Sequence, residues 1–341
     1  MPLAARIMTS AALLVAGCAL SGCTRTTAPA RVSRSREIMG TLATLTAVAD
    51  DEGRAAAAVE AGYARLADVN RLMSDYVAES EIGRLNRLPA GSPVAVAPET
   101  FQCVQRAVEF ARDSGGAFDV TCRPLVALWR AAGEQQRLPT ADELRQVRDL
   151  VGTEKLTLDA GAHTITLQRA GMQIDLGGIA KGYALDLAAQ AMRQTGAASL
   201  LIDVGGDVLA LGCAPTGQPW HVGVKHPFTG GLIAVLQISD RAVATSGVQQ
   251  RFHEIGGKRY SHIVDPRSGQ PAEQAPSVTV IARDGITADA WATAFSVLSV
   301  AEGKELLAAG AAPGVEVLWI TGSAAQPVLD QTPGFAAYMV R

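Results

Sequence analysis

The chain has 341 residues, of which 48% are hydrophobic and 18% charged, and its formal net charge at pH 7 is −3. This length and hydrophobic content allow one large domain or two closely packed ones. A nucleic-acid-binding protein usually carries a basic excess or a basic run, and the sequence has neither. We therefore expect a globular protein that binds no nucleic acid.

Residues 1–22 have the pattern of a secretory signal peptide: an early positive charge at Arg6, an apolar run, and then small residues. The run is too short and too lightly flanked for a transmembrane helix. It ends in LSGC, which resembles the lipobox of bacterial lipoproteins, where the cysteine is lipidated and becomes the new N-terminus. We expect lipidation at Cys23, although the earlier stretch VAGC, which ends at Cys18, also fits the lipobox pattern. The alternative to a lipoprotein is a secreted protein in which the cysteine is incidental. A multiply acylated cysteine anchors a protein stably to a membrane.

The segment that follows, residues 23–37, is polar and lacks periodicity, so we expect a tether between the lipid and a domain at 38–341. Three further cysteines, Cys103, Cys122 and Cys213, are irregularly spaced and odd in number, which indicates neither a disulfide framework nor a zinc site. We expect them to be small, buried apolar residues.

The apolar pattern predicts strands and helices that mix without strict alternation, which favours an α+β fold over a doubly wound sheet. Thr140 and Glu143 form a capping-box pattern at the start of one helix. The expected strands lie at 38–48, 172–175, 199–211, 220–224, 232–238, 277–282 and 315–321, with a hairpin at 156–167. The expected helices lie at 55–73, 100–112, 140–152 and 287–298, and one more ends near 195.

The common site motifs are absent: the sequence has no G-x-S-x-G, no P-loop, no G-x-G-x-x-G and no H-E-x-x-H. The stretch IDLGGIAKGYA, by contrast, places Asp175 at the end of a strand and Gly178 in a strand-to-helix turn. Glycines let the backbone approach a ligand there, and the free N–H groups of the helix start bind an anion. Lys181 adds a positive charge. The alternative is a tight connection with a solvated lysine.

The stretch GITADAWATAF places Asp289 and Thr293 four residues apart, on one face of a helix for which Thr287 is the expected N-cap. A carboxylate and a hydroxyl stacked in this way offer two hard oxygen ligands to Mg²⁺. This cation usually keeps some of its bound waters and also binds the phosphates of a substrate. The alternative is that Asp289 only favours the positive helix N-terminus, while Thr293 bonds back to a carbonyl.

Two other stretches carry aromatic residues. SGGAFDVTCRPLVALW combines a glycine turn with Phe118 and Asp119, and an aromatic ring beside backbone polar groups suits a planar ligand. The alternative is a helix end that leads into the core. Tyr76 either stacks on a ring or simply packs, and packing is the more common outcome.

The stretch YSHIVDPRSGQP contains His262, one of only five histidines. An imidazole donates to a phosphate oxygen or takes a proton near neutral pH. DPRSG is a turn pattern, so Asp265 either orients the histidine or only caps the turn. Taken alone, the stretch also fits an ordinary polar turn.

Eight blocks, in this order, resemble the ApbE-like FAD:protein FMN transferases: MGT, Y…SEIGRLN, GGAFD…PLVALW, IDLGGIAKGYA, LIDVGGD, ATSG, SHIVDPRSGQP and ADAWATAF. They span residues 38–298. The resemblance implies a single T-fold-like α+β domain with mixed or antiparallel sheets and flanking helices. It also implies that FAD is cleaved, that the FMN phosphate is placed on a threonine or serine hydroxyl of an acceptor protein, and that AMP is released.

The resemblance also assigns residues to the site. The Mg²⁺ ligands would be Asp289, Thr293 and the backbone carbonyl of Gly178. Some relatives carry Glu in place of Lys181, which leaves the exact contact of this lysine open. Some relatives also carry an acidic residue in place of Ala292, so one further carboxylate near the metal is absent here. The FAD contacts would be Met39, Tyr76, Ala117, Phe118, Asp119, Asp175, Lys181, His262 and Ile263.

The chemistry that the resemblance implies is physically reasonable. Mg²⁺ on the pyrophosphate oxygens neutralises the charge that would repel an incoming hydroxyl and stabilises the leaving AMP. We expect His262 and Asp289 to be the catalytic residues. His262 would donate to the developing negative charge, and either Asp289 or a metal-bound water would remove the proton of the acceptor hydroxyl.

The implied partners are FAD, flavin-carrying subunits of Nqr- and Rnf-type membrane redox complexes, and a membrane reached through the lipid anchor. The protein would face the periplasm, and Thr24 after the lipidated cysteine favours the outer membrane if the host sorts lipoproteins by that residue. Two other functions fit the same sequence: an FAD pyrophosphatase that uses water as the acceptor, and a flavin-binding lipoprotein without catalysis. A mere binder has little need for Asp289 and Thr293 together, whereas a transferase needs both.

Overall fold

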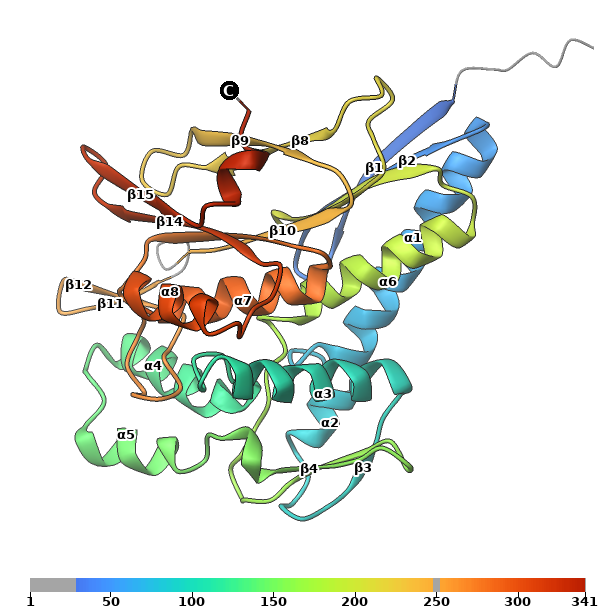
Figure 1. The fold of residues 1–341 in the computed structure, drawn as a ribbon. Helices are drawn as coiled ribbons and strands as arrows, with labels where there is room; N and C mark the ends of the chain where they lie inside the picture. The colour runs from blue at the N-terminus through green and yellow to red at the C-terminus, as the bar shows by residue number, and fades with distance from the viewer. Residues whose placement is uncertain (1–28, 248–251, 341) are drawn as a thin grey trace, which may run out of the picture.

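The computed structural model describes residues 29–247 and 252–340, so the predicted signal peptide and both candidate lipidation sites, Cys18 and Cys23, lie outside the described residues. The described chain has the expected α+β fold, with an extended antiparallel sheet covered by helices (Figure 1). None of the helices in the described ranges has the length and apolar content needed to cross a membrane.

The main sheet has eight strands in the order β1-β2-β6-β7-β10-β13-β14-β15, and every neighbouring pair is antiparallel. Three smaller sheets accompany it, in the orders β3-β5-β4, β8-β9 and β11-β12. The strands of the main sheet are β1 (Ala30–Ile38), β2 (Thr41–Ala49), β6 (Ser199–Val204), β7 (Asp207–Leu211), β10 (Arg241–Ser246), β13 (Ser277–Ala282), β14 (Glu316–Gly322) and β15 (Pro327–Gln331). The other strands are β3 (Val94–Ala95), β4 (Leu156–Asp159), β5 (Thr164–Leu167), β8 (Trp220–Lys225), β9 (Leu232–Ile238), β11 (Phe252–Ile255) and β12 (Lys258–Ser261).

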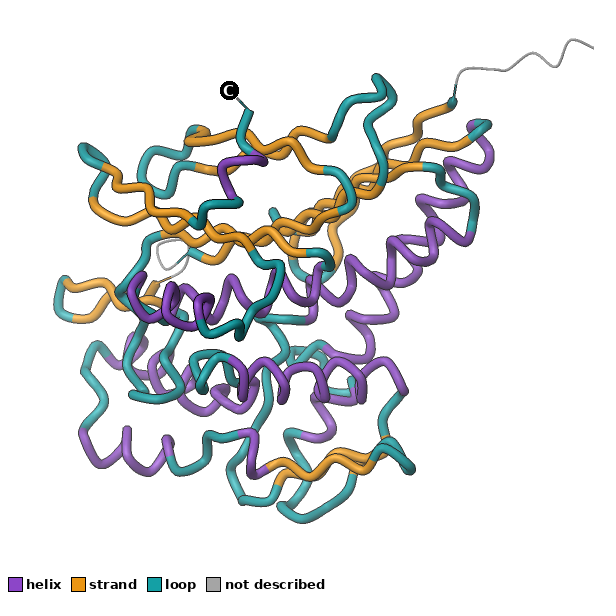
Figure 2. The backbone as a smooth tube through the Cα atoms, in the orientation of Figure 1, coloured by secondary structure: helices purple, strands orange, loops and turns teal. Residues whose placement is uncertain are grey.

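Three helices, α1 (Glu52–Met73), α6 (Ala180–Gln194) and α7 (Gly285–Val297), pack against one face of the main sheet (Figure 2). The opposite face is covered by the β8–β9 hairpin, whose Trp220 and Leu236 join a second apolar cluster. The remaining helices are α2 (Glu81–Leu85), α3 (Pro98–Asp113), α4 (Arg123–Gln135), α5 (Ala141–Arg148) and α8 (Val300–Ala308), with short 3₁₀ turns η1 (Val120–Cys122), η2 (Thr153–Lys155) and η3 (Phe335–Tyr338).

Most of the predicted elements are confirmed within a few residues. The Thr140–Glu143 capping box is formed, although its helix ends at Arg148 and not at 152. The predicted helix at 287–298 begins earlier, because Asp284 and not Thr287 is the N-cap: the Asp284 carboxylate accepts a hydrogen bond from the Thr287 N–H at 3.0 Å.

Three predictions about the backbone were wrong. Residues 30–37 of the expected tether form most of β1, an edge strand whose hydroxyls bond across to β2, as between Ser33 and Thr46 at 2.8 Å. The expected strand at 172–175 has no strand partner, because both backbone groups of Ile174 bond the side chain of Asn86 at 2.8 Å. The single strand expected at 38–48 is in fact the end of β1, a two-residue turn and β2.

The cysteines only partly match the prediction of small buried residues. Cys103 is buried, Cys122 is half-buried, and Cys213 is exposed, with its sulfur 3.6 Å from the Ser239 hydroxyl. The prediction was therefore wrong for Cys213, which lies just beyond the end of β7.

Candidate active site

The N-terminal segment of α6 lies directly against α7. A Cβ atom placed on Gly178 would lie 3.0 Å from Thr293 Oγ1 and 3.4 Å from the ring of Phe118. Any side chain at position 178 would thus press on the hydroxyl of Thr293. Three predicted site residues from three separate stretches of the sequence therefore meet at one point.

Asp289 lies one helical turn before Thr293 and is buried, with 3% of its surface exposed. Its Oδ2 accepts a hydrogen bond from the Gly182 N–H at 2.9 Å, in the first turn of α6, and its Oδ1 lies 3.8 Å from Lys181 Nζ. Asp289 thus faces the N-terminus of α6, not that of its own helix. Burial raises the pKa of this carboxyl to about 6; the Lys181 charge and the Gly182 N–H oppose the rise, and the nearby Asp207 adds to it.

Lys181 connects Asp289 to a second buried carboxylate. Its ammonium forms an ion pair with Asp207, whose side chain is only 3% exposed. Asp207 also accepts a hydrogen bond from the Thr245 N–H at 3.3 Å, and Thr245 belongs to the ATSG block on β10. The lysine predicted to contact FAD therefore lies between two acids at the candidate metal site.

The turn between β1 and β2 brings Met39 to the same end of the main sheet as the β6–β7 turn, which precedes Asp207. The Gly205 N–H, in the turn before β7, donates to the Leu42 carbonyl at 3.0 Å. Met39 (φ 53°) and Gly40 (φ 69°) form a two-residue turn in which both residues have positive φ. A non-glycine residue with positive φ is uncommon, and such strain is often retained at functional sites.

The donor atoms of Asp289, Thr293 and Gly178 suit a hard divalent cation. In residues 29–247 and 252–340, no three His, Cys, Asp or Glu side chains are grouped so as to hold a metal. The predicted set needs only one such side chain, because a hydroxyl and a backbone carbonyl complete it, and both are oxygen ligands of the kind Mg²⁺ takes. The absence of a Cβ at Gly178 leaves the space beside Thr293 Oγ1 open. The residues present therefore fit the predicted cation.

The loop after α3 contributes Ala117, Phe118 and Asp119, all buried. The Phe118 N–H donates to the Ser114 hydroxyl at 3.0 Å, and its ring packs edge-on against Phe110. The Asp119 carboxylate accepts hydrogen bonds from the backbone and hydroxyl of Thr121, and burial raises its pKa.

Asp175 is adjacent to this loop. Its N–H donates to the Val120 carbonyl at 2.8 Å, and its carboxylate accepts from the Gly177 N–H at 2.7 Å. Burial raises the pKa of Asp75, and the negative charge of Asp175 adds to this rise. The predicted FAD contacts of these two stretches are therefore neighbours in the fold.

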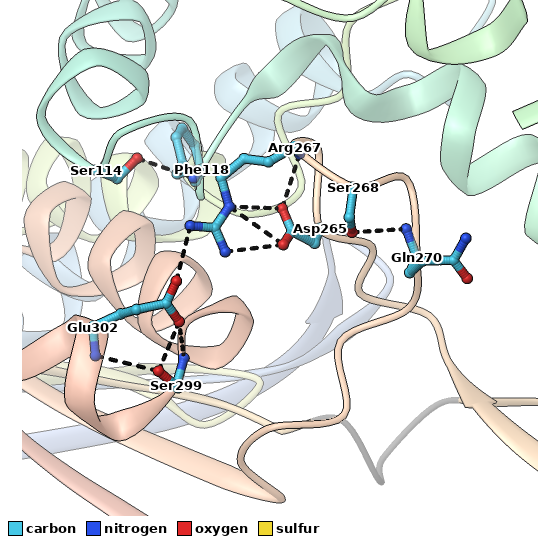
Figure 3. A network of polar contacts seen from close by, with 8 residues as sticks. All are labelled: Ser114, Phe118, Asp265, Arg267, Ser268, Gln270, Ser299 and Glu302. Atoms are coloured by element: carbon cyan, nitrogen blue, oxygen red, sulfur yellow. Dashed lines mark hydrogen bonds and ion pairs between the residues drawn. The ribbon is translucent and has the colours of Figure 1, made fainter. Parts of the chain in front are cut away.

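His262 lies in a bend after β12 and is half-buried. Figure 3 shows the turn that follows it: Asp265 binds the guanidinium of Arg267 at 2.9 Å, and Arg267 reaches Glu302 on α8 at 3.4 Å. Gly116 lies beside the Arg267 side chain, since a Cβ there would be 3.6 Å from Arg267 Cγ. Asp265 thus holds the turn through Arg267.

The last two predicted FAD contacts, Tyr76 and Ile263, differ in how far they are exposed. Tyr76 follows α1 and is 82% exposed, so the expectation that it packs was wrong and its ring is accessible. Ile263 packs against the main core, and its carbonyl accepts from the Ala272 N–H at 2.8 Å. A cavity of about 540 Å³ lies beside the loop that carries Ile263, and its lining residues include Trp129, Tyr260 and Asp265.

A sequence model of the ApbE family matches residues 39–319, which is most of the chain. The chain belongs to the ApbE family. It is 30% identical over 345 residues to the FAD:protein FMN transferase of Escherichia coli, and this alignment covers 97% of each protein. It is 38% identical over 246 residues to the enzyme of that name from Klebsiella pneumoniae, covering 71% of this chain and 73% of the relative.

A solved ApbE structure has the same fold. The flavin transferase ApbE from Vibrio cholerae superposes with a TM-score of 0.78 at 28% identity, covering 91% of this chain and 99% of that one. The antiparallel α+β architecture described above is therefore that of the ApbE family.

Two residues of this candidate site were not among the predicted contacts. Asp207 binds Lys181, and Asp186 binds the start of α7 through the N–H groups of Gly285 and Ile286. A pattern for Asp207 was present, because it ends the LIDVGGD block at a glycine turn. Asp186 carried no such indication, since a polar residue within a helix is usually solvated.

Proposed function

We propose that this ApbE-family protein, an FAD:protein FMN transferase, splits FAD at its pyrophosphate on a divalent-cation site formed by Asp289, Thr293 and the carbonyl of Gly178. The proposal is supported chiefly by one observation: Gly178, at the start of α6, faces Thr293 on α7, one turn from the buried Asp289. When bound, Mg²⁺ would supply positive charge to the pyrophosphate oxygens and to the leaving phosphate.

The protein's own residues bind and orient FAD in this proposal. Lys181 directs its charge towards the phosphates while Asp207 holds its ammonium in place. Phe118 and Asp119 contact the flavin nucleotide from the loop after α3, and Tyr76 offers an exposed ring for stacking. Met39, Ala117, Asp175 and Ile263 complete the predicted FAD contacts.

The transfer step forms a bond between the acceptor hydroxyl oxygen and the FMN phosphorus, and it breaks the bond from that phosphorus to the bridging oxygen, which leaves with AMP. His262 donates a hydrogen bond to the charge that develops on the phosphates. Either Asp289 or a water on the bound cation would take the proton of the acceptor hydroxyl.

We place the protein at the cell envelope, anchored through a lipidated Cys23 and facing the periplasm, where flavin-carrying subunits of Nqr- or Rnf-type complexes are the proposed acceptors. The support is the signal-peptide and lipobox pattern of residues 1–23. Metabolic labelling with a palmitate analogue tests the anchor: Cys23→Ala should lose the label and leave the membrane fraction, whereas Cys18→Ala should keep both.

One experiment tests the function directly. The protein is mixed with FAD, Mg²⁺ and an acceptor fragment, and the mass of the acceptor is followed together with AMP. A transferase gives equal amounts of AMP and flavinylated acceptor. AMP without modified acceptor indicates an FAD pyrophosphatase, and neither product indicates a flavin-binding protein without catalysis.

The matched variant is Asp289→Ala, which should abolish AMP release while FAD is still bound, because the nucleotide contacts lie on other elements. Unchanged AMP release in this variant would refute the proposed cation site.

A further inference from the structure

Helices α6 and α7 cross at a point where both have glycine. A Cβ on Gly182 would lie 2.1 Å from the Gly285 carbonyl oxygen, and a Cβ on Gly285 would lie 2.3 Å from the Gly182 carbonyl oxygen. The two helix backbones are therefore in direct contact at their first turns. This contact sets how closely the helices approach, but it does not by itself fix how far one slides along the other.

Two aspartates restrict the sliding by exchanging caps between the helices. Asp186, on α6, accepts hydrogen bonds from the N–H groups of Gly285 at 2.6 Å and Ile286 at 2.9 Å, the first two residues of α7. Asp289, on α7, accepts from the Gly182 N–H in the first turn of α6. First-turn N–H groups have no partner within their own helix, so each carboxylate satisfies donors that would otherwise be unpaired.

We propose that Asp186 is a positioning residue for the cation site, which keeps Thr293 on α7 in place against Gly178 at the start of α6. Gly178 precedes α6 by two residues, and Thr293 lies two turns into α7, so their contact depends on the axial position of one helix relative to the other. Asp186 touches neither FAD nor the cation; it acts through the start of α7. This inference rests on the cation site of the proposed function.

Binding of Mn²⁺ alone, followed by electron paramagnetic resonance, measures the site without turnover. Asp186→Asn keeps the size of the side chain but turns an amide NH₂ towards a backbone N–H donor. We expect this variant to bind Mn²⁺ about 10- to 100-fold more weakly, and its kcat for AMP release to fall by a similar factor, as is usual when a partner that orients a ligand is lost. The KM for FAD should stay within about twofold of wild type, because the contacts that bind FAD equally in the ground state and the transition state are unaffected.

The control is Asp284→Ala, which removes the N-cap of the same helix but leaves both contacts to α6 in place. It should lower the melting temperature while Mn²⁺ affinity and kcat stay at wild-type values. Wild-type Mn²⁺ affinity and kcat in Asp186→Asn would overturn the inference, as would equal losses in Asp284→Ala. If the wild-type protein binds no Mn²⁺, or Asp289→Ala binds it equally well, the cation site of the proposed function fails, and the inference about Asp186 fails with it.

Discussion

Lys181 and Asp207 form an ion pair at the base of the site, with the Asp207 side chain buried and about a third of the Lys181 side chain exposed. The two residues come from different blocks of the sequence, one at the start of α6 and one at the start of β7. Because Asp289 lies 3.8 Å from the same ammonium, one lysine offsets the charge of two buried acids. Lys181 therefore has a structural role as well as its proposed contact with FAD.

These two roles of Lys181 are separable by mutation. Lys181→Met leaves the buried carboxylate of Asp207 unpaired, which should lower the free energy of unfolding by about 3 kcal/mol, the lower end of the usual range because the lysine is partly exposed. Adding Asp207→Asn removes the unpaired charge and should recover most of that stability. Activity should not return in the double variant, because the positive charge near the phosphates is still missing. Urea unfolding of both variants measures the stability, and AMP release measures the activity. Recovery of activity in the double variant would argue against a contact between Lys181 and the phosphates.

Gly178→Ala tests the contact between the start of α6 and Thr293. The new Cβ would lie 3.0 Å from Thr293 Oγ1 and 3.2 Å from its methyl group, so the threonine must move by a few tenths of an ångström. A misplacement on the order of 1 Å costs about 100-fold in rate, so this smaller shift should cost roughly 10-fold in kcat. Thr293→Ser removes the methyl group and should restore part of the activity in the Gly178→Ala background. An unchanged kcat in Gly178→Ala would show that Thr293 needs no exact placement.

The sequence predicted the elements whose stabilising contacts are local. Thr140 and Glu143 cap each other across three residues, and the spacing of Asp289 and Thr293 puts both towards the start of α6. The sequence pattern pointed to Thr287 as the N-cap of α7, but the backbone angles of the folded chain put Asp284 in that role; both residue types cap helices.

Long-range contacts explain what sequence patterns missed. Strand β1 is exposed along most of both faces, so it has no alternating apolar pattern, and its register comes from β2. Residues 172–175 look apolar enough for a strand, but Asn86, far away in the sequence, takes the hydrogen bonds of Ile174. The bonds from Asp186 to α7 span about 100 residues, a distance at which no local pattern indicates a partner.

Gly182→Ala should separate the two helices. Its Cβ would lie 2.1 Å from a backbone carbonyl, which no side-chain rotation relieves, so α6 and α7 must move apart. Overpacking of this kind costs about 1–3 kcal/mol of unfolding free energy, even though alanine is the better helix former. Gly53→Ala, in the first turn of α1, is the control, since the nearest atom to its Cβ is the Asp51 carboxylate at 3.2 Å. Equal stability of the two variants in urea unfolding would mean that the crossing is looser than the structure indicates.

The stability conferred by Asp186 should depend on pH. Burial raises the pKa of its carboxyl from 3.8 to about 7; the N–H groups of Gly285 and Ile286 oppose this rise, and Asp284 adds to it. Between these two pH values the folded protein keeps a proton that the unfolded chain has released, so unfolding becomes easier as the pH rises. Asn at this position is neutral throughout. The stability of wild type relative to Asp186→Asn should therefore fall by about 1.4 kcal/mol per pH unit across this window and level off above it.

Urea unfolding of both proteins across the window measures the slope. Asp289 titrates in both proteins, so its contribution cancels in the difference. A difference that does not change with pH would show that Asp186 is already ionised in the folded state, with its two N–H bonds outweighing the cost of burial.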